Sequence, residues 1–486
     1  MYKIGFSSEL YAKEQSAKIA DRVSKFNRLY LEFGGKLFDD YHASRILPGF
    51  EPDNKIKMLL QLKDKVEVLL AINANDVEKS KTRSDIGITY TQDLLNKIDA
   101  FKNVGLDLGG VVITHFTSQI NAINLRKKLE KLGIKVAYHY LIDNYPNNVD
   151  LVLSANGFGK NEYIKTSKDI IVVTAPGPGS GKLATCLSQM YHDNLNGIKS
   201  GYAKFETFPV WNLPLNHMVN LAYESATVDL SDFNLIDPFH LDKYGKVAIN
   251  YNRDVEAFPI VNELLTKILG KQIYFSPTDM GCNMIASGIV DDEICVEASK
   301  QEIIRRYYDS RVKAFMDEQY ADEIGKQEQI MAKANIKIEE RTCAVKANEI
   351  AKLTGKPAVA LELADGTIIT GKTKDLMGSS SAALLNAIKY LAKIGDIDLL
   401  QKENLEPIQT LKTEYLKSKN PRLHMEEMLL ALAIGSKTDD NCKKALEALK
   451  LLKNAEAHST VILSKKDIMT FKKLGIRLTM EAAYER

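Results

Sequence analysis

The chain has 486 residues, of which 45% are apolar and 26% charged, and this composition is typical of a folded globular protein, not of a disordered or fibrous chain. The 65 basic and 63 acidic side chains nearly cancel, which removes the overall positive field that drives sequence-independent binding to nucleic acid or to anionic membranes. We therefore expect neither partner, and the length suggests about three domains or subdomains.

The cysteine pattern and the N-terminal sequence bear on the cellular compartment. The five cysteines include no CxxC pair, which is typical of a reducing compartment. The first residues lack the apolar core of an export signal, and no run of about 18 apolar residues occurs. We expect a cytoplasmic protein without a membrane span.

The first 150 residues alternate between short strand-like runs and amphipathic helical runs, the pattern of β-α units on a mostly parallel sheet, and a second α/β stretch begins at Asp169. The expected strands are Arg28–Phe33, Val66–Ile72, Val111–His115, Ile134–Tyr140, Asp169–Thr174, Lys204–Phe208 and Val247–Tyr251. The expected helices include Gln92–Phe101, Gln119–Leu132 and Val261–Leu269. We predict a Rossmann-like or P-loop-like three-layer α/β body over residues 1–298, with its ligand at the carboxyl ends of the strands.

The remainder of the chain is expected to form two smaller parts. Residues 299–355 are rich in charge and poor in glycine and proline, which predicts a helical connector or subdomain. Residues 356–486 are expected to form a C-terminal α/β subdomain, in which Asp365-Gly366 is a strong hairpin signal. The elements expected there are the strands Pro357–Leu363, Thr367–Thr370 and Ala457–Leu463 and a helix that begins at Ser379.

The sharpest local feature is the glycine-rich segment TAPGPGSGKLAT at residues 174–185, which follows an apolar strand and opens a helical run. In this context glycines let the backbone approach a phosphate, the helix N-terminus adds partial positive charge, and a lysine reaches the phosphate. The expected phosphate-binding residues are Gly177, Gly179, Ser180, Gly181 and Lys182. The alternative is a tight turn with Lys182 in solvent.

The match to the Walker pattern is incomplete. Pro176 occupies the position of the first glycine, and Leu183 occupies the position where a Ser or Thr binds magnesium. Thr185 could replace that hydroxyl only if the loop geometry differs. ATP or GTP with Mg²⁺ therefore stays one option, and the cofactor itself is unknown.

Two other strand ends supply candidate residues. Gly34, Gly35 and Lys36 follow the first expected strand, and we expect them to contact the phosphate compound. Because the carboxyl ends of parallel strands meet at one edge, this loop and the glycine-rich loop should face one cleft. The alternative is a charged loop in solvent with Asp39 as a helix cap.

The candidate catalytic residues are Lys182, Asp40, His42 and Arg253. The first is the loop lysine, and the next two lie in a dense group of ionisable residues at a strand end. Arg253 follows a later strand and would suit an anion clamp. The alternative is that Arg253 lies on the surface in solvent and binds no ligand.

The C-terminal hairpin followed by a helix has the layout of nucleoside deaminase-like domains. Zinc deaminases need a His or Cys, two further Cys and a Glu at fixed spacing. Here His424-Met425-Glu426 is not followed by PCxxC, and Cys442 stands alone. We expect no zinc and no other metal bound by this subdomain, with similarity at the level of the fold only.

Four segments together resemble a bacterial protein family of unknown function: Phe33–Arg45, Thr174–Lys182, Lys204–Pro214 and Asn250–Asp254. The resemblance extends over essentially the whole chain. It implies a cytoplasmic bacterial protein with an α/β body, a helical subdomain and a C-terminal α/β subdomain. It implies no reaction, because the family has no established one.

The sequence favours an enzyme that binds a nucleotide or another small phosphorylated molecule, with group transfer or ligation as the reaction class. The alternative is a non-catalytic metabolite-binding or regulatory protein that uses the same loop as a sensor. Carboxylates near a phosphate site favour the enzyme, because an anion receptor gains nothing from them. A homo-oligomer is also considered, and an RNA-associated protein is disfavoured by the balanced charge.

Overall fold

The computed structural model describes all residues except 1–2, 36, 39, 84–86, 401 and 486. The chain divides into two compact units, an N-terminal unit, Ile4–Ala298, and a C-terminal unit built on Ser299–Arg486. Within the described residues, no helix combines the length and apolar character needed to cross a membrane.

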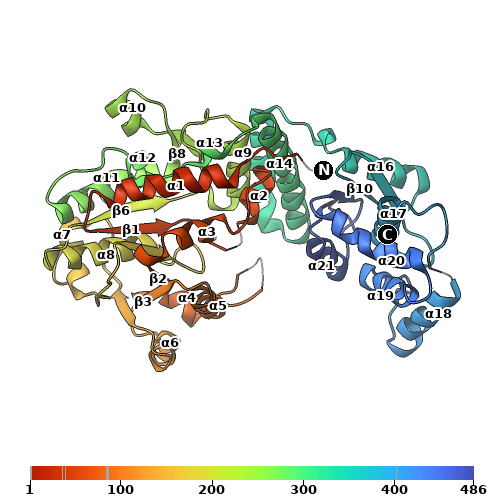
Figure 1. The fold of residues 1–486 in the computed structure, drawn as a ribbon, viewed down its shortest axis with the longest axis horizontal. Coiled ribbons are helices and arrows are strands. Elements are labelled where there is room, and N and C mark those ends of the chain that lie inside the picture. Colours follow the sequence, from red (N-terminus) through yellow and green to blue (C-terminus); the bar gives the residue numbers. More distant parts are fainter. Residues whose placement is uncertain (1–2, 36, 39, 84–86, 401, 486) are drawn as a thin grey trace. The chain divides into compact units, whose positions relative to one another are not determined.

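A seven-stranded sheet with strand order β4-β3-β2-β5-β1-β6-β9 forms the centre of the N-terminal unit (Figure 1). Every neighbouring pair in it is parallel. The strands are β1 (Arg28–Phe33), β2 (Val66–Asn73), β3 (Asp107–Phe116), β4 (Val136–Tyr140), β5 (Ile170–Thr174), β6 (Ser200–Phe205) and β9 (Gly281–Cys282). A separate antiparallel pair consists of β7 (Asn234–Ile236) and β8 (Ile249–Tyr251). The predicted mostly parallel α/β body is confirmed.

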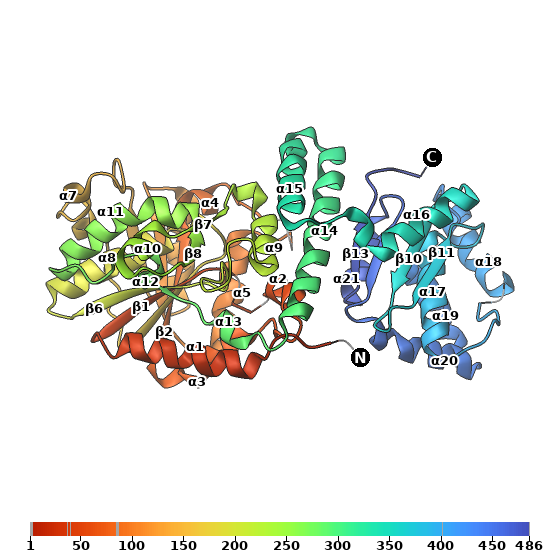
Figure 2. The same ribbon diagram turned by 90° about the horizontal axis from the view of Figure 1, so that it is seen from above.

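Helices cover both faces of the sheet, with α1 and α3 on one side and α8 and α11 on the other (Figure 2). The helices of this unit are α1 (Ser8–Val23), α2 (Tyr41–Ile46), α3 (Asn54–Gln61), α4 (Ala74–Glu78), α5 (Tyr90–Asn103), α6 (Ile120–Lys131), α7 (Val149–Val152), α8 (Lys182–Leu195), α9 (Met218–Ala226), α10 (Pro238–Tyr244), α11 (Asn252–Leu269), α12 (Pro277–Met280) and α13 (Ile285–Gly288). On the α8 face, Tyr30, Ile171 and Tyr202 of three adjacent strands pack with Met190 and Phe258. This core holds the strands in place and leaves their carboxyl ends open to connecting loops.

The order of the strands creates a crevice at those carboxyl ends. The chain leaves β2 for β3 on one side, whereas it leaves adjacent β5 for β6 on the other side. Loops that diverge in this way leave room between them, which is where open α/β sheets bind ligands.

The C-terminal unit contains a mixed sheet of order β11-β10-β12-β13, in which only the last pair is parallel. Its elements after α14 (Asp292–Met316), which begins before the unit boundary, are α15 (Ala321–Ala334), α16 (Thr342–Thr354), β10 (Ala358–Glu362), β11 (Ile368–Lys372), α17 (Ser379–Leu391), α18 (Lys402–Thr410), α19 (Met425–Gly435), α20 (Asp440–Glu447), β12 (Glu456–Ser459), α21 (Lys465–Lys473) and β13 (Arg477–Met480). Helix α17 packs closely on β11. The approach is visible at Gly371 of β11, where a Cβ would lie 2.1 Å from the backbone nitrogen of Ala383 in α17.

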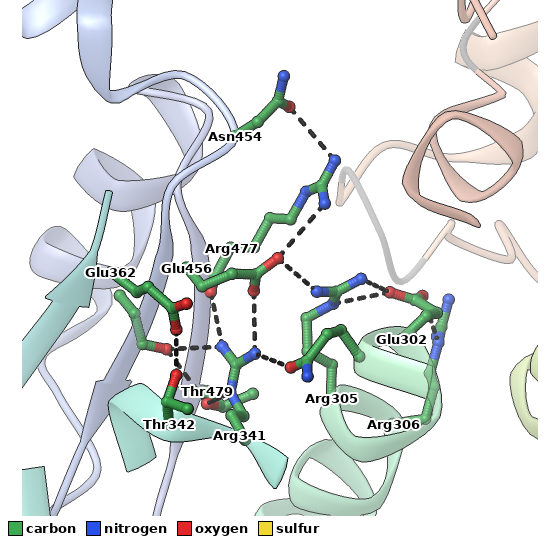
Figure 3. Close-up of polar contacts among 12 residues, drawn as sticks. Glu302, Arg305, Arg306, Arg341, Thr342, Glu362, Asn454, Glu456, Arg477 and Thr479 are labelled. Atoms are coloured by element: carbon green, nitrogen blue, oxygen red, sulfur yellow. Dashed lines mark hydrogen bonds and ion pairs between the residues drawn. The ribbon is translucent and has the colours of Figure 1, made fainter. Parts of the chain in front are cut away.

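A buried arginine network ties the helical part of this unit to its sheet (Figure 3). Arg341 has no exposed surface, and it donates to Glu456 (2.9 Å), to Thr479 Oγ1 (2.8 Å) and to backbone carbonyls of β12 and β13. Glu456 also accepts hydrogen bonds from Arg305 (2.6 Å) and Arg477 (3.3 Å). Burial alone would raise the pKa of Glu456, but the arginines outweigh it and hold the pKa at about 2. The carboxyl group of Glu456 is therefore ionised at neutral pH.

Candidate active site

A cavity of about 1020 Å³ lies at the carboxyl ends of the strands of the large sheet. Its walls come from the loops after β1, β3, β4 and β5, from the end of β6, and from the start of α11. A cavity of this size accommodates a molecule larger than inorganic phosphate. The cavity is therefore the candidate active site.

The glycine-rich loop between β5 and α8 forms one wall of the cavity. Gly179 and Gly181 have φ values of +72° and +80°, a left-handed conformation that glycine adopts at little cost. Gly181 is the N-cap of α8, so Lys182 is the first residue of the helix. The loop therefore points the free N–H groups and the partial positive charge of a helix N-terminus at the cavity.

Side chains donate hydrogen bonds to three carbonyl groups of this loop. The hydroxyl of Ser180 donates to the carbonyl of Gly177 (2.7 Å), and the hydroxyl of Thr114 donates to the carbonyl of Ser180 (2.9 Å). The amide of Asn73 donates to the carbonyl of Gly179 (3.2 Å). Within the described residues, the N–H groups of Gly179 and Gly181 have no hydrogen-bond acceptor. Acceptors are thus occupied while donors are available, which suits an anion.

Close approach explains two of the glycines. A Cβ on Gly177 would lie 2.4 Å from the hydroxyl of Tyr90, and a Cβ on Gly181 would lie 3.0 Å from the side chain of Thr114. Tyr90 in turn lies under the ammonium group of Lys81, 5.1 Å from its ring centroid. The loop is thereby packed against β3 and α5.

Cations outnumber carboxylates among the described residues that line the cavity. The cations are Lys81, Arg83, Lys97, Lys182, Lys204 and Arg253, and the carboxylates are Glu32, Glu206, Asp232 and Asp254. Arg83 and Lys97 contact Asp93 at 3.0 and 3.4 Å, whereas Lys182 has no ion-pair partner in the described part of the chain. A lysine without an internal partner is available to a bound anion.

Two carboxylates share one ammonium group at the end of β6. Lys204 Nζ lies 2.9 Å from Glu206 and 2.5 Å from Asp254, and each of the three side chains is about one-fifth exposed. Burial raises the pKa of Glu206 to about 7, with Lys204 opposing the rise and Asp254 and Glu32 adding to it. Glu206 therefore exchanges a proton near neutral pH, the range in which a general acid or base works best.

The side chain of Glu206 lies against Gly34 at the end of β1. A Cβ on Gly34 would lie 2.8 Å from Cγ of Glu206, so a larger residue there would displace the carboxylate. Deeper in the same wall, the hydroxyl of Tyr202 donates to Glu32 at 2.7 Å. Gly34, in the loop after β1, thus leaves the space that the side chain of Glu206 occupies in the wall of the cavity.

Residues 4–335 match the family model "Domain of unknown function DUF1846, N-terminal", and residues 339–486 match "Domain of unknown function DUF1846, C-terminal". The UPF0371 proteins of Streptococcus pyogenes serotypes M5 (strain Manfredo) and M18 (strain MGAS8232) and of Streptococcus uberis are each 52% identical over 487 residues, which cover 100% of this chain and 99% of each relative. The chain belongs to the DUF1846 family. The resemblance to a family of unknown function is confirmed, and the descriptions assign no activity.

Most of the predicted site residues of this DUF1846 chain line one cavity. The residues that do so are Gly34, Gly35, Gly177, Gly179, Ser180, Gly181, Lys182 and Arg253. Lys36, predicted beside them, lies outside the described residues, as does Asp39. The loop after β1 and the glycine-rich loop therefore share a cavity, as their strand ends suggested. Arg253 is 56% exposed and pairs with Asp232 at 3.1 Å.

Three predicted residues are not among those that line the cavity. Asp40 caps α2 and pairs with Lys55 at 2.8 Å, and the ring of His42 packs on Phe208. The hydroxyl of Thr185 donates to the carbonyl of Gly181 at 2.9 Å inside the helix and is not among the groups that line the cavity, so Thr185 does not take the place of the missing Ser or Thr. Where the described residues are concerned, no three His, Cys, Asp or Glu side chains could together hold a metal ion.

Sequence reasoning missed the charged group at the end of β6 and two histidines. His115 follows Thr114 in β3 and has a φ of +54°, which is unusual for a residue with a side chain. His139 of β4 is buried, and burial lowers the pKa of its imidazole to about 3. The sequence signal for the first group was Lys204 and Glu206 two residues apart, because such residues share one face of a strand.

Proposed function

We propose that this DUF1846 chain is an enzyme that binds a nucleotide or another phosphorylated metabolite, with the phosphate on Gly177–Lys182. The observation that carries the proposal is the loop itself. Its carbonyl groups are held by side chains, N–H groups at its glycines have no acceptor in the described chain, and Lys182 begins the helix beside them. Such an arrangement stabilises a phosphate by charge-assisted hydrogen bonds.

Glu206 supports an enzyme over a non-catalytic receptor. A carboxyl group with a pKa of about 7 lines the same cavity as the loop, and a receptor for anions would be weakened by a carboxylate. Proton transfer at Glu206 is suited to group transfer or ligation, in which a ligand hydroxyl or amine must lose a proton as it attacks. The reaction class rests on this residue.

The test is a ligand screen followed by one substitution. Nucleotides, sugar phosphates and inorganic phosphate are added to the full-length protein, and thermal unfolding is followed by the fluorescence of Trp211, the only tryptophan, which reports the N-terminal unit. A ligand present at about 100 times its dissociation constant should add roughly 2.7 kcal/mol to the free energy of unfolding.

Lys182→Ala should then weaken binding of any ligand found by about 10- to 150-fold, because a charged hydrogen bond contributes roughly 1.5–3 kcal/mol. Lys465→Ala is the matched control, since Lys465 is also the first residue of a helix but lies in the C-terminal unit. Circular dichroism checks that both variants fold. Unchanged affinity in folded Lys182→Ala, or no binding by any phosphate compound, would contradict the proposal.

A further inference from the structure

The cavity has a basic side and an acidic side. Lys182 and the loop lie on the basic side together with Lys81, whose ammonium group sits over the Tyr90 ring that packs on Gly177. Glu206 and Asp254 lie on the acidic side, at the end of β6 and the start of α11. A ligand that fills the cavity therefore meets different chemistry at its two ends.

Strand register gives the distance between these sides. Glu32 of β1 is level with Val173 of β5 and with Lys204 of β6. Glu206 is two residues beyond Lys204, and the glycine-rich loop begins the same number of residues beyond Val173, so both lie at one edge of the sheet. The phosphate-binding part of the loop continues past the end of β5, because Gly179 accepts from Asn73 at the end of β2 and Gly181 lies against Thr114 of β3. These two strands lie three and four positions from β6, and three to four strand spacings amount to about 14–19 Å.

Charges of both signs alternate within hydrogen-bond distance on the acidic side. Lys204 separates Glu206 from Asp254 at 2.9 and 2.5 Å, and all three are partly open to the cavity. A cation there would meet the ammonium group of Lys204, and an anion would meet two carboxyl groups. A hydroxyl group both donates and accepts, so neighbouring hydroxyls can satisfy carboxylates and an ammonium group together.

We propose that the ligand is a phosphate ester of a hydroxyl-rich compound, a sugar phosphate either free or as part of a nucleotide, whose hydroxyl groups bind Glu206 and Asp254. This inference rests on the proposed function, because it assumes that the phosphate occupies Gly177–Lys182. After a hydrogen bond of about 3 Å at each end, the separation of about 14–19 Å leaves about 8–13 Å for the ligand, which suits a sugar phosphate or a nucleotide. The volume of about 1020 Å³ holds either.

The experiment compares probes that carry one or both halves of this ligand. Isothermal titration calorimetry measures the affinity of the full-length protein for inorganic phosphate, ribose 5-phosphate, glucose 6-phosphate, AMP and free ribose. At least one of the three phosphate esters should bind about tenfold or more tightly than inorganic phosphate, because hydrogen bonds to charged groups contribute at this level. Tighter binding of AMP than of either sugar phosphate identifies the nucleotide source, and the reverse order identifies the free sugar phosphate.

Glu206→Gln should reduce that advantage to within about threefold of inorganic phosphate, since the amide has a single, uncharged oxygen acceptor and an NH₂ donor in place of the second oxygen. Asp254→Asn is the second variant, used if circular dichroism shows that the first does not fold. Glu263→Gln is the control, because Glu263 is an exposed glutamate of α11 in the same unit.

The outcomes separate this inference from the proposed function. If inorganic phosphate binds through Lys182 and the esters bind no more tightly than phosphate, the proposal of a sugar phosphate ligand is wrong and the proposal of a phosphate-binding loop remains. A gain that survives in folded Glu206→Gln, or in Asp254→Asn where the first variant does not fold, would overturn the assignment of the hydroxyls to Glu206 and Asp254. Failure of every phosphate compound to bind would overturn both proposals together.

Discussion

Replacing Glu206 by glutamine should raise the stability of the N-terminal unit relative to the original protein as the pH rises from 5.5 to 8. The carboxyl group is held beside Asp254 and Glu32 in a mostly buried position, and burial raises its pKa from 4.5 to about 7. Ionising it in the folded protein therefore costs free energy that the unfolded chain does not pay. Glutamine has nearly the same shape and never ionises.

The two pKa values determine the size of the effect. Between pH 4.5 and about pH 7 the folded protein retains a proton that the unfolded chain has released, so the free energy of unfolding falls as pH rises. From pH 5.5 to pH 8 this loss amounts to about 2 kcal/mol. Because Glu206→Gln lacks the loss, its stability relative to the original protein should increase by about 2 kcal/mol over the same interval.

Urea unfolding followed by the fluorescence of Trp211 measures this difference, since that residue reports the N-terminal unit alone. Glu263→Gln, at a glutamate that is 52% exposed on α11, should stay within about 0.5 kcal/mol of the original protein at both pH values. A stability difference for Glu206→Gln that does not change between pH 5.5 and pH 8 would refute the raised pKa and, with it, the role of Glu206 in proton transfer.

Two further pairs of substitutions test the loop and the C-terminal unit. Gly181→Ala should lower the free energy of unfolding of the N-terminal unit by about 2 kcal/mol, because the positive φ is strained for alanine and the Cβ would lie 3.0 Å from Thr114. Gly179→Ala has the same strain but open space around the Cβ, so it should lower this free energy by about 1 kcal/mol. Equal urea midpoints for the two variants would contradict the Thr114 contact. Arg341→Ala should destabilise the C-terminal unit by about 3–5 kcal/mol, because it removes one of three arginines that pair with Glu456, takes the donor from two backbone carbonyls and empties the space of a fully buried side chain. Arg422→Ala, which removes a partly exposed surface pair, should cost under about 1 kcal/mol, and hydrogen exchange of β12 and β13 distinguishes the two.

Strands with continuous apolar runs could be located from the sequence. The predicted strand at Arg28–Phe33 coincides with β1, and Val66–Ile72 is one residue short of β2. Strand β6 was predicted as Lys204–Phe208 but runs from Ser200 to Phe205. Its start was missed because serine and glycine are poor strand formers; a Cβ on Gly201 would lie 2.4 Å from the ring of Phe26, so packing requires glycine there.

The candidate site could be predicted only where its residues are consecutive. The glycine-rich loop has its strand, turn and helix in one short segment, and each part carries its own signal. Lys204, Glu206 and Asp254 come together because β6 lies beside β1 and α11 begins near the same edge, and no spacing in the sequence states that register. Asp40 and His42 stand in a run of high charge density in the sequence, but their side chains pair or pack within the fold.

The supports of the glycine-rich loop come from parts of the chain that no local pattern connects. Asn73 ends β2 and Thr114 lies near the end of β3, and both donate to carbonyl groups of the loop. A simple turn needs no such help, because its carbonyl groups can be satisfied by water at the surface. Holding them in place fixes the direction of the N–H groups before a ligand arrives, which lowers the entropy lost on binding. Two neighbouring strands therefore supply the side chains that would make this loop an anion site, and the strand order that places them there is what the sequence alone could not show.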